Sequence, residues 1–515
     1  MTSPTAAHAA TRGEVRRDLA ALLAGVATPF AFAPFDLYPL AVLAPAVLFA
    51  LWLPASAARA AWRGFLYGVG LFGVGVSWVF VSMHTFGNMP PALATLAVAL
   101  FVAGLALFPA AAGGLQARFA PLATPTRLAL VMPAIWTLLE WIRGWFLTGF
   151  PWLNLGYSQT DTPLAGLASW LGVYGMSFAV AVSAGLLAAI WFHRRRAAWY
   201  FAAAVLLWVV ADLAGRVEWA QPASASFSVG LVQGNIPLAI KWRPEYREKI
   251  VSEYLSLSEL APQARLIVWP EAAVPGYFDL LAPTLVPPLE RIARERGTEF
   301  LIGAIERDAR GRAYYNSVYA VGSHPGSYRK QHLVPFGEFL PFPAAFRWFI
   351  EQLHIPMSDF AVGGAGQTLL YAGGQPLGVS VCYEDAFGEE IVSTLPAARL
   401  LVNVSEDSWF GNSLAPHQRL QMARVRALEA GRWMLRAANT GPSAIIDHHG
   451  NVVRRSMQFV PYVLTGVVQP MEGATPYVRF GNYPIVVLAM LIALGAYAPR
   501  LRKVPMVQVR KSRAS

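Results

Sequence analysis

Long runs of apolar residues constrain this 515-residue chain more than any other feature of its sequence. A helix needs roughly 20 mostly apolar residues to cross the hydrocarbon core of a bilayer. Hydrophobic residues make up 55% of the chain and charged residues only 14%, which excludes disordered and collagen-like chains and favours an integral membrane protein. The expected spans cover about residues 18–33, 39–54, 64–82, 91–113, 128–147, 163–191, 197–215 and 481–498.

Basic residues gather at the ends of these apolar segments. The net charge of +11 could suggest nucleic-acid binding, but residues 216–476 hold 23 basic and 24 acidic residues, so no basic groove and no nucleic-acid partner are expected. Residues 477–515 hold 7 basic residues and no acidic ones. The short loops 34–38, 83–90 and 148–162 carry neither lysine nor arginine, whereas the alternate connections are rich in arginine.

This charge asymmetry predicts a topology. Cytoplasmic loops carry the excess of lysine and arginine, so both termini are expected in the cytoplasm and the block 216–480 on the opposite face of the membrane. No cleavable signal peptide is evident, and Arg16-Arg17 is explained better as flanking charge than as a twin-arginine signal. We expect a transmembrane part of about seven spans over 1–215, an exported domain over 216–476, and a final span with a basic cytoplasmic tail over 477–515.

The exported block has a different pattern, in which short β-branched runs alternate with amphipathic, charged stretches. This alternation predicts an α/β domain of about 250 residues with helices covering the faces of its sheets. Strands are expected at 227–233, 266–269, 300–305, 317–321, 378–382, 400–404, 443–446 and 463–468. Helices are expected at 244–260, 285–296, 386–395 and 416–431.

The single cysteine, Cys382, stands at the end of an apolar strand and is followed by Tyr-Glu-Asp. One cysteine excludes a disulfide framework. An α/β fold exposes reacting groups where its strands end, so Cys382 is a candidate nucleophile. The alternative is a small buried hydrophobic residue, the ordinary role of a lone cysteine in an apolar strand.

Two other segments carry groups that could serve such a nucleophile. Glu271 ends the apolar run Ile-Val-Trp-Pro-Glu, where partial burial would raise its pKa toward that of a useful base; the alternative is a solvated loop glutamate. Lys330 could stabilise an oxyanion, or could be an ordinary surface lysine. Glu338, eight residues on, could orient that lysine or cap a loop.

A third segment, residues 403–432, is rich in charge. Its arginines and Glu429 fall on one face of a helix, which indicates structural ion pairs. His417 is an alternative base for Cys382. No P-loop and no metal-ligand cluster are recognised in the sequence, so neither a metal nor another cofactor is expected.

Together, Glu271, Lys330 and Cys382 form a chemically complete set for acyl transfer. A thiol is mostly protonated near neutral pH, since its reference pKa is about 8.5, and it therefore needs a base. Glu271 can accept the thiol proton, and Lys330 can stabilise the tetrahedral anion. The product of the first half-reaction is a thioester on Cys382.

The motifs Trp-Pro-Glu271, Tyr-Arg-Lys330 and Cys382-Tyr-Glu384 resemble, in this order, the Glu-Lys-Cys set of the nitrilase superfamily. Taken with the eight apolar spans and the segments 232–237 and 332–338, they indicate the apolipoprotein N-acyltransferases, the membrane branch of that superfamily. The resemblance covers about residues 18–500.

This resemblance implies an αββα nitrilase-like domain on the periplasmic face of the bacterial inner membrane. It implies transfer of a fatty acyl chain from a phospholipid, typically phosphatidylethanolamine, to the amino group of the diacylglyceryl cysteine of an apolipoprotein. Ping-pong kinetics follow if both lipids use one site in turn. We expect a monomer that works in the lipid bilayer.

The resemblance also assigns roles to individual residues. Glu271 is the expected base, Lys330 the oxyanion stabiliser and Cys382 the acylated nucleophile. Glu338 and Glu384 are expected to support the site. The expected substrate contacts are Trp242, Phe336 and Tyr383.

Three further interpretations are left to test. The aromatic stretch 340–350 is expected to form an interfacial arm over the acyl-chain binding region, unless it is ordinary packing. A membrane-anchored amidase would use the same three residues but would pass the acyl group to water. A transporter with an exported binding domain is disfavoured because Glu140 and Arg143 are the only paired charges recognised within the spans, and they are expected to pair locally.

Overall fold

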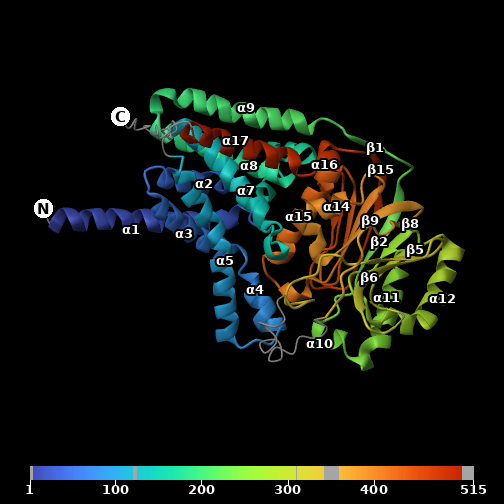
Figure 1. Ribbon diagram of the computed structural model, residues 1–515. Coiled ribbons are helices and arrows are strands. Elements are labelled where there is room, and N and C mark those ends of the chain that lie inside the picture. The colour runs from blue at the N-terminus through green and yellow to red at the C-terminus, as the bar shows by residue number, and fades with distance from the viewer. Residues whose placement is uncertain (1–3, 120–123, 309, 342–358, 502–515) are drawn as a thin grey trace, which may run out of the picture.

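The computed structural model describes residues 4–119, 124–308, 310–341 and 359–501 (Figure 1). It combines a helical region with a sandwich of two β-sheets, and the two lie side by side. The main helices of the helical region are α1 (Pro4–Ala27), α2 (Leu40–Trp52), α3 (Ala57–Gly75), α5 (Pro91–Ala117), α7 (Met132–Arg143), α8 (Ala168–Phe192), α9 (Ala197–Gly215) and α17 (Tyr483–Leu501). Short helical turns connect them, including α4 (Trp78–Phe80) and a π-helical turn at Val81–Phe86.

Helices therefore occupy every range that was predicted to be apolar, but fewer of them can cross a membrane unaided. In the described residues, three helical segments are long and apolar enough: Pro91–Ala117, Pro163–Phe192 and Arg194–Gly215. A bent pair, Ala57–Gly75 with Trp78–Phe86, would make a fourth, and it bends by 53°. The prediction of eight spans is not confirmed, because several of the predicted ranges form helices that are too short or carry too many charges.

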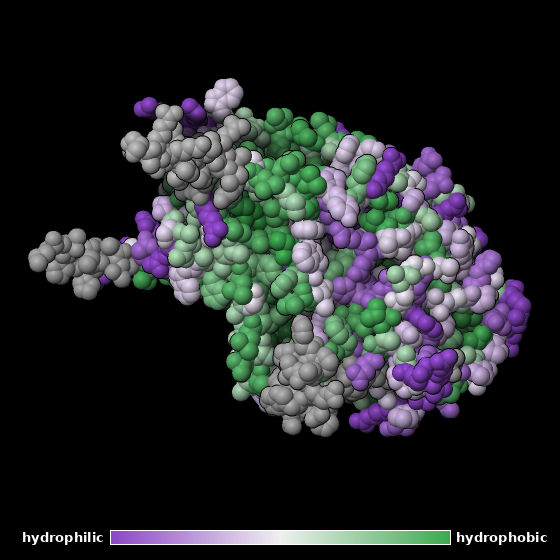
Figure 2. Space-filling model, in the orientation of Figure 1, coloured by the Kyte–Doolittle hydropathy of each residue, from purple (hydrophilic) through white to green (hydrophobic). Residues whose placement is uncertain are grey.

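The helical region presents apolar side chains to its surroundings. Only 6% of the apolar stretch of α9 is buried inside the protein, and Trp199 on this helix is 76% exposed. Figure 2 shows hydrophobic residues over the helical region and hydrophilic residues gathered over the sheets at the right. An uncovered apolar surface of this extent is typical of a protein that contacts lipid.

The sandwich consists of a seven-stranded and a six-stranded sheet. The first has the order β14-β2-β3-β5-β6-β7, with β4 paired to β5, and the second has the order β13-β12-β11-β10-β9-β8. The strands of the first are β2 (Phe227–Gln233), β3 (Leu266–Val268), β4 (Val274–Tyr277), β5 (Glu299–Arg307), β6 (Tyr314–Val321), β7 (Gly326–Arg329) and β14 (Tyr462–Val468). The strands of the second are β8 (Leu370–Ala372), β9 (Gln375–Val381), β10 (Leu400–Ser405), β11 (Met434–Ala438), β12 (Ala444–Ile446) and β13 (Val452–Arg455). A small separate pair joins β1 (Ala220–Pro222) to β15 (Met471–Gly473).

Alternation along the strands explains the layered core. Residues such as Val229, Leu231 and Val379 alternate inward and meet in one cluster between the sheets. The outer face of the first sheet packs on α11 (Arg247–Ser258) and α12 (Phe278–Arg296). The outer face of the second packs on α14 (Gly388–Val392) and α15 (Ala415–Ala430). The αββα arrangement is the one expected from the sequence.

All eight expected strands and all four expected helices are present; most ends move by a few residues, but α12 begins seven residues before the expected helix at 285–296. The strand β11 was not predicted, because Arg436 interrupts its apolar run. Arg436 is nevertheless buried, and its guanidinium is paired with Asp407 at 2.6 Å. The pairing offsets part of the cost of placing a charge inside the sheet.

The helix α15 joins the sandwich to the helical region. The side chain of Gln418 is 2% exposed, accepts a hydrogen bond from Trp152 Nε1 at 2.8 Å and donates to the carbonyl of Gly75 at 3.0 Å. Glu429 accepts from the backbone N–H of Val173 at 2.8 Å. The side of the sandwich covered by α15 is therefore fixed against the helices.

Glu140 and Arg143 do not form the direct ion pair that was expected. Glu140 accepts hydrogen bonds from Trp136 Nε1 and from the backbone N–H of Leu155. Arg143 donates to the carbonyl of Trp152 and to two other acceptors in the loop 148–162. The two side chains thus fold this loop back onto α7 rather than neutralise each other.

Candidate active site

The functional candidates lie where strands of both sheets end. Glu271 follows β3, and Cys382 follows β9 directly. The strands β3 and β5 are parallel neighbours, as are β9, β10 and β11. Carboxyl ends of parallel strands meet at one edge of a sheet, so the chain delivers these side chains to the same end of the sandwich.

The carboxylate of Glu271 is held by fixed donors. Its side chain accepts from Asn316 Nδ2 at 2.7 Å and from the backbone N–H of Glu406 at 2.7 Å. Ala272, the next residue, has a φ of +46°, a backbone conformation that is rare for residues other than glycine. The turn after β3 therefore holds Glu271 in one orientation, and the carboxylate is buried.

Lys330 lies between two carboxylates. Its Nζ is 2.7 Å from Glu338 Oε2 and 3.9 Å from Glu271 Oε1, and its side chain is 1% exposed. Asn316 also donates to Glu338, at 3.0 Å. Glu338 therefore orients the lysine, which is one of the two roles that the sequence left open. The surface-lysine alternative for Lys330 is wrong, because the residue is buried.

Cys382 occupies a strained turn. Its φ is +52°, in the left-handed region that a residue with a Cβ rarely adopts. Its carbonyl accepts hydrogen bonds from Asn403 Nδ2 at 3.2 Å and from Arg419 Nη2 at 2.6 Å. Cys382 is only partly buried, and it packs against the edge of the apolar cluster between the sheets. The strain is stored where the chain turns abruptly to present the thiol.

Arg419 was not singled out from the sequence. Its Nη1 lies 3.6 Å from Cys382 Sγ, and the guanidinium is also paired with Asp385 and Asp407. The sequence did contain an indication that Arg419 is buried, because Arg419 and Arg426 are seven residues apart on one helical face, beside apolar residues. Two arginines on an apolar face indicate buried cations.

The charges in this cluster act on one another. Burial raises the pKa of the Cys382 thiol to about 12, a shift increased by the Glu271 carboxylate and opposed by Arg419 and Lys330. Burial also raises the pKa of Glu271, against the opposing charge of Lys330. Burial disfavours the charged form of Lys330, but Glu338 and Glu271 outweigh it and raise its pKa above the ordinary value. The resting cluster therefore holds a neutral thiol beside a lysine cation and a carboxyl group with raised proton affinity.

A second buried network supports the backbone of Glu271. Lys241 donates to the carbonyl of Glu271 at 3.2 Å and is ion-paired with Glu406. Asn439, which follows β11, donates to the same carboxylate at 3.0 Å. Glu406 thus links the ends of β10 and β11 to the turn that carries Glu271.

Glu384 fixes the segment that carries Lys330. Its carboxylate accepts from the backbone N–H groups of Val381 and Gln331 at 2.6 Å and from that of His332 at 3.1 Å. It also accepts from Tyr328 Oη at 3.0 Å. Burial raises the pKa of Glu384 to about 7, which the backbone donors oppose. The Glu384 side chain therefore connects the turn at Cys382 to the residues on either side of Lys330.

The three predicted substrate contacts lie in different surroundings. Trp242 is half-buried, with its ring 5.9 Å from Lys241 Nζ, and so adjoins the network behind Glu271. Phe336 is 37% exposed on the turn that leads to Glu338, and its N–H donates to the carbonyl of Phe339. Tyr383 is buried against the helical region.

The hydroxyl of Tyr383 donates to the carbonyl of Gly149 at 2.8 Å, and its ring stacks on Trp152 at 6.0 Å. This tyrosine therefore ties the cysteine turn to the loop 148–162. Most of the predicted arm 340–350 lies outside the described residues, because residues 342–358 are not among them.

His417 and the charged face of α15 complete the comparison with the sequence. The charged groups that act on His417 are Arg455 and Asp36, whereas Cys382 is contacted by Arg419 from the same helix. The expected structural ion pairs are present: Arg426 is 3.0 Å from Glu429. Glu271 thus lies with the lysine and cysteine in one buried cluster, and His417 faces other groups.

One group of possible metal ligands was missed. In the described residues, the structure brings Glu218 beside His448 and His449, with their ligand atoms within 4.8 Å of one another. The sequence did not reveal it because Glu218 is 230 positions from His448. The group lies outside the cluster around Cys382.

Comparison with known proteins covers both parts of the chain. Residues 24–186 match the model of the apolipoprotein N-acyltransferase N-terminal domain, and residues 228–477 match that of carbon-nitrogen hydrolase. Similar solved structures include XC1258 of Xanthomonas campestris, a CN-hydrolase superfamily protein, with 17% identity and a TM-score of 0.36 over 51% of this chain and 97% of that one. The NitFhit protein of C. elegans has 16% identity and a TM-score of 0.39 over 50% of this chain and 63% of that one.

Curated relatives match nearly the whole chain. The apolipoprotein N-acyltransferase of Methylococcus capsulatus is 46% identical over 96% of this chain and 98% of its own length. That of Nitrosomonas europaea is 45% identical over 93% of this chain and 96% of its own. That of Pseudomonas aeruginosa is 41% identical over 94% and 96%. The nitrilase-like fold predicted for the exported domain is confirmed, and the chain belongs to the apolipoprotein N-acyltransferase family.

Proposed function

We propose that this enzyme moves a fatty acyl chain from a phospholipid to the terminal amino group of a diacylated apolipoprotein through a thioester on Cys382. The chain is an acyltransferase of lipoprotein biosynthesis, in keeping with the family to which it belongs. Its acceptor is a lipoprotein and its donor a phospholipid. The residues that carry the reaction, its steps and the membrane topology are our proposal.

In the first half-reaction, the carboxylate of Glu271 takes the thiol proton as Cys382 attacks the ester carbonyl of the phospholipid. The high pKa of the thiol makes this base necessary, because little thiolate forms unaided. Lys330, held as a cation by its two carboxylates, stabilises the developing oxyanion. Glu271 then protonates the departing alkoxide, and a lysophospholipid leaves.

In the second half-reaction, the amino group of the diacylglyceryl cysteine attacks the thioester carbonyl. Glu271 accepts the proton that the amine loses, and Lys330 again faces the oxyanion. Collapse of the intermediate forms an amide and expels the sulfur of Cys382, which regains its proton. One site handles both lipids in turn, so ping-pong kinetics follow.

The observation that carries this proposal is the buried Glu271–Lys330 pair at 3.9 Å beside the strained turn of Cys382. The charges of this carboxylate and this cation both act on the thiol of Cys382. Glu338 orients the lysine, and Glu384 holds residues on both sides of it, Tyr328 before and Gln331 after. Substrate contact by Trp242, Phe336 and Tyr383 remains a prediction.

We also propose that residues 216–476 form a periplasmic catalytic domain, between a transmembrane part at 1–215 and a final span and cytoplasmic tail at 477–515. Figure 1 shows α1 beginning and α17 ending on the side of the helical region away from the sheets, which supports placing both termini together. The exposed apolar surface of α9 supports contact with the bilayer. Both substrates are anchored in the same bilayer, so we expect the enzyme in the bacterial inner membrane. We also expect it to be a monomer.

The proposal is tested with the purified full-length protein in phospholipid vesicles, with a diacylated lipopeptide as acceptor. We expect N-acylated lipopeptide from the wild-type protein and none from Cys382→Ala. Persistent N-acylation by Cys382→Ala would overturn the assignment of the nucleophile. Far-UV circular dichroism of both proteins controls for folding.

The hydrolytic alternative is separated by leaving out the acceptor. A transferase retains the acyl group on the enzyme, so release of lysophospholipid stops after about one equivalent. Continuous release of free fatty acid from vesicles alone would instead identify a hydrolase.

A further inference from the structure

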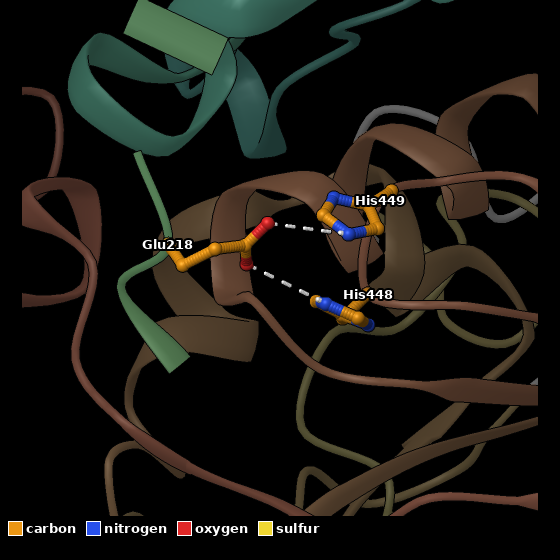
Figure 3. A group of neighbouring side chains, drawn as sticks. All are labelled: Glu218, His448 and His449. Atoms are coloured by element: carbon orange, nitrogen blue, oxygen red, sulfur yellow. Dashed lines mark ion pairs between the residues drawn. The ribbon is translucent and has the colours of Figure 1, made fainter. Parts of the chain in front are cut away.

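Glu218, His448 and His449 form a cluster of side chains that the proposed function does not use (Figure 3). Glu218 lies in the segment between α9 and β1, which connects the helical region to the sandwich. The two histidines lie in the turn between β12 and β13. Figure 3 shows the carboxylate pointing to both rings, one oxygen toward each.

The distances in this cluster suit a shared ion better than direct hydrogen bonds. Glu218 Oε2 is 3.7 Å from His448 Nε2, and Oε1 is 3.5 Å from His449 Nε2. A charge-assisted hydrogen bond would bring such atoms to about 2.8 Å. Two nitrogen or oxygen ligands of one tetrahedral zinc ion, each about 2.1 Å from it, are about 3.4 Å apart.

We propose that Glu218, His448 and His449 bind a divalent transition-metal ion of the zinc type, with water completing the coordination. Two imidazoles and one carboxylate are a donor set that suits zinc. Asp447 is not available as a further ligand, because its carboxylate accepts from the N–H groups of His449 and Asn451 and thereby shapes the turn. The turn thus presents the two rings side by side, 3.9 Å between centroids.

The topology makes this ion a structural rather than a catalytic one. The strand β12 runs antiparallel to β11, whereas β9, β10 and β11 are mutually parallel. The turn after β12 therefore lies at the end of the sheet opposite to Cys382, which follows β9. A bound ion would connect the segment that leaves α9 to the edge of the six-stranded sheet. The inference goes beyond acyl transfer and does not depend on it.

The test uses the full-length protein without a histidine tag, stripped with a chelator, and zinc alone as the probe. We expect about one zinc equivalent by calorimetric titration, and a rise in the unfolding temperature of about 4 °C at a hundredfold excess over Kd. Both effects should be lost in His449→Gln and Glu218→Gln. The matched control is His324→Gln, since His324 is an exposed histidine outside the cluster.

The variants also separate this site from zinc bound at Cys382. Zinc binding and stabilisation that are the same in wild-type, His449→Gln and Glu218→Gln proteins would overturn the proposal, as would the absence of binding. In either case Glu218 forms ion pairs with His448 and His449, and the three residues bind no metal ion. Acyl transfer is expected to be unchanged in both variants, because neither residue lies in the catalytic cluster.

Discussion

At the scale of single residues, the surroundings of Cys382 suit a lone thiol at the edge of the apolar core to the role of nucleophile that we propose for it. The turn holds its backbone in a strained conformation, and Arg419 fixes the carbonyl that follows the thiol. In the proposed mechanism, the neighbouring carboxylate of Glu271 supplies the base that the thiol's high pKa requires. On that proposal, reactivity is a property of the cluster rather than of the cysteine.

Arg419→Lys tests the positioning of the thiol. Lysine keeps the buried positive charge beside Asp385 and Asp407 but cannot reach the Cys382 carbonyl with the planar fork of arginine. We expect kcat to fall by ~100-fold, the effect of a misplacement of about 1 Å, with little change in KM for phospholipid. Arg424→Lys, at the exposed Asp161 pair on the same helix, is the control and should retain activity. Full activity of Arg419→Lys would show that the thiol does not need this contact.

The pH dependence of thioester formation tests Glu271. The carboxylate is the active base, so the rate should fall as pH decreases through its pKa. Burial raises that pKa above the ordinary value of 4.5, so the loss should occur at a higher pH than for an exposed glutamate. Single-turnover rates measured across acidic pH check this, with Glu472→Gln as an exposed control. A midpoint at or below 4.5 would contradict the assignment.

At the scale of elements, α15 connects the two parts of the molecule. Gln418 on this helix fills two buried hydrogen-bonding positions, on Trp152 and on Gly75. The same helix carries Arg419, so the position of the thiol depends on how the helical region and the sandwich are joined.

Gln418→Leu is expected to weaken this junction. It leaves the indole N–H of Trp152 and the carbonyl of Gly75 buried without their present partner, at a cost of about 3 kcal/mol in folding free energy. Thermal unfolding in detergent micelles measures the loss against Gln263→Leu, a change of an exposed glutamine. Equal unfolding temperatures for the two variants would show that α15 does not hold the parts together.

The sequence predicted well those elements whose residues nearly all pack into the core. Strands such as β2 and β10 are mostly apolar, and the burial of both faces explains that composition. The three motifs that contain Glu271, Lys330 and Cys382 were visible because each is local. Their meeting in one cluster could be expected from strand ends alone.

What the sequence could not reveal depends on contacts between distant segments. Ion pairs were expected for the arginines of residues 403–432 but without assigned partners, and only the fold places Asp407 between Arg419 and Arg436. The expected Glu140–Arg143 pair failed because backbone acceptors of a later loop compete for the arginine. Spacing along the chain shows which groups are close in sequence. It does not show which groups the fold brings into contact.

At the scale of the whole molecule, the apolar surface and the net charge are both distributed unevenly between the helical region and the sandwich. The hydrophobic surface lies over the helical region, and the hydrophilic surface lies over the sandwich (Figure 2). The net charge of +11 is concentrated outside the nearly neutral residues 216–476. In the proposed topology, such a molecule holds the proposed catalytic site at the edge of the bilayer that contains both lipid substrates.

The proposed topology can be tested because the chain has one cysteine. In a Cys382→Ala background, Ala58→Cys and Ser323→Cys each place a single thiol on an exposed position. A membrane-impermeant maleimide added to intact spheroplasts should label the cysteine at 323 and not that at 58. Permeabilised cells, in which both should react, are the control. The reverse labelling would place the sandwich in the cytoplasm.

The central claim is that the acyl chain rests on Cys382 between the two half-reactions. The most direct measurement is mass spectrometry of the wild-type protein after incubation with phosphatidylethanolamine in the absence of acceptor. The account predicts one fatty acyl group on the peptide that contains Cys382, removed when diacylated lipopeptide is added. N-acylation of that lipopeptide by a protein whose Cys382 is never acylated would contradict it.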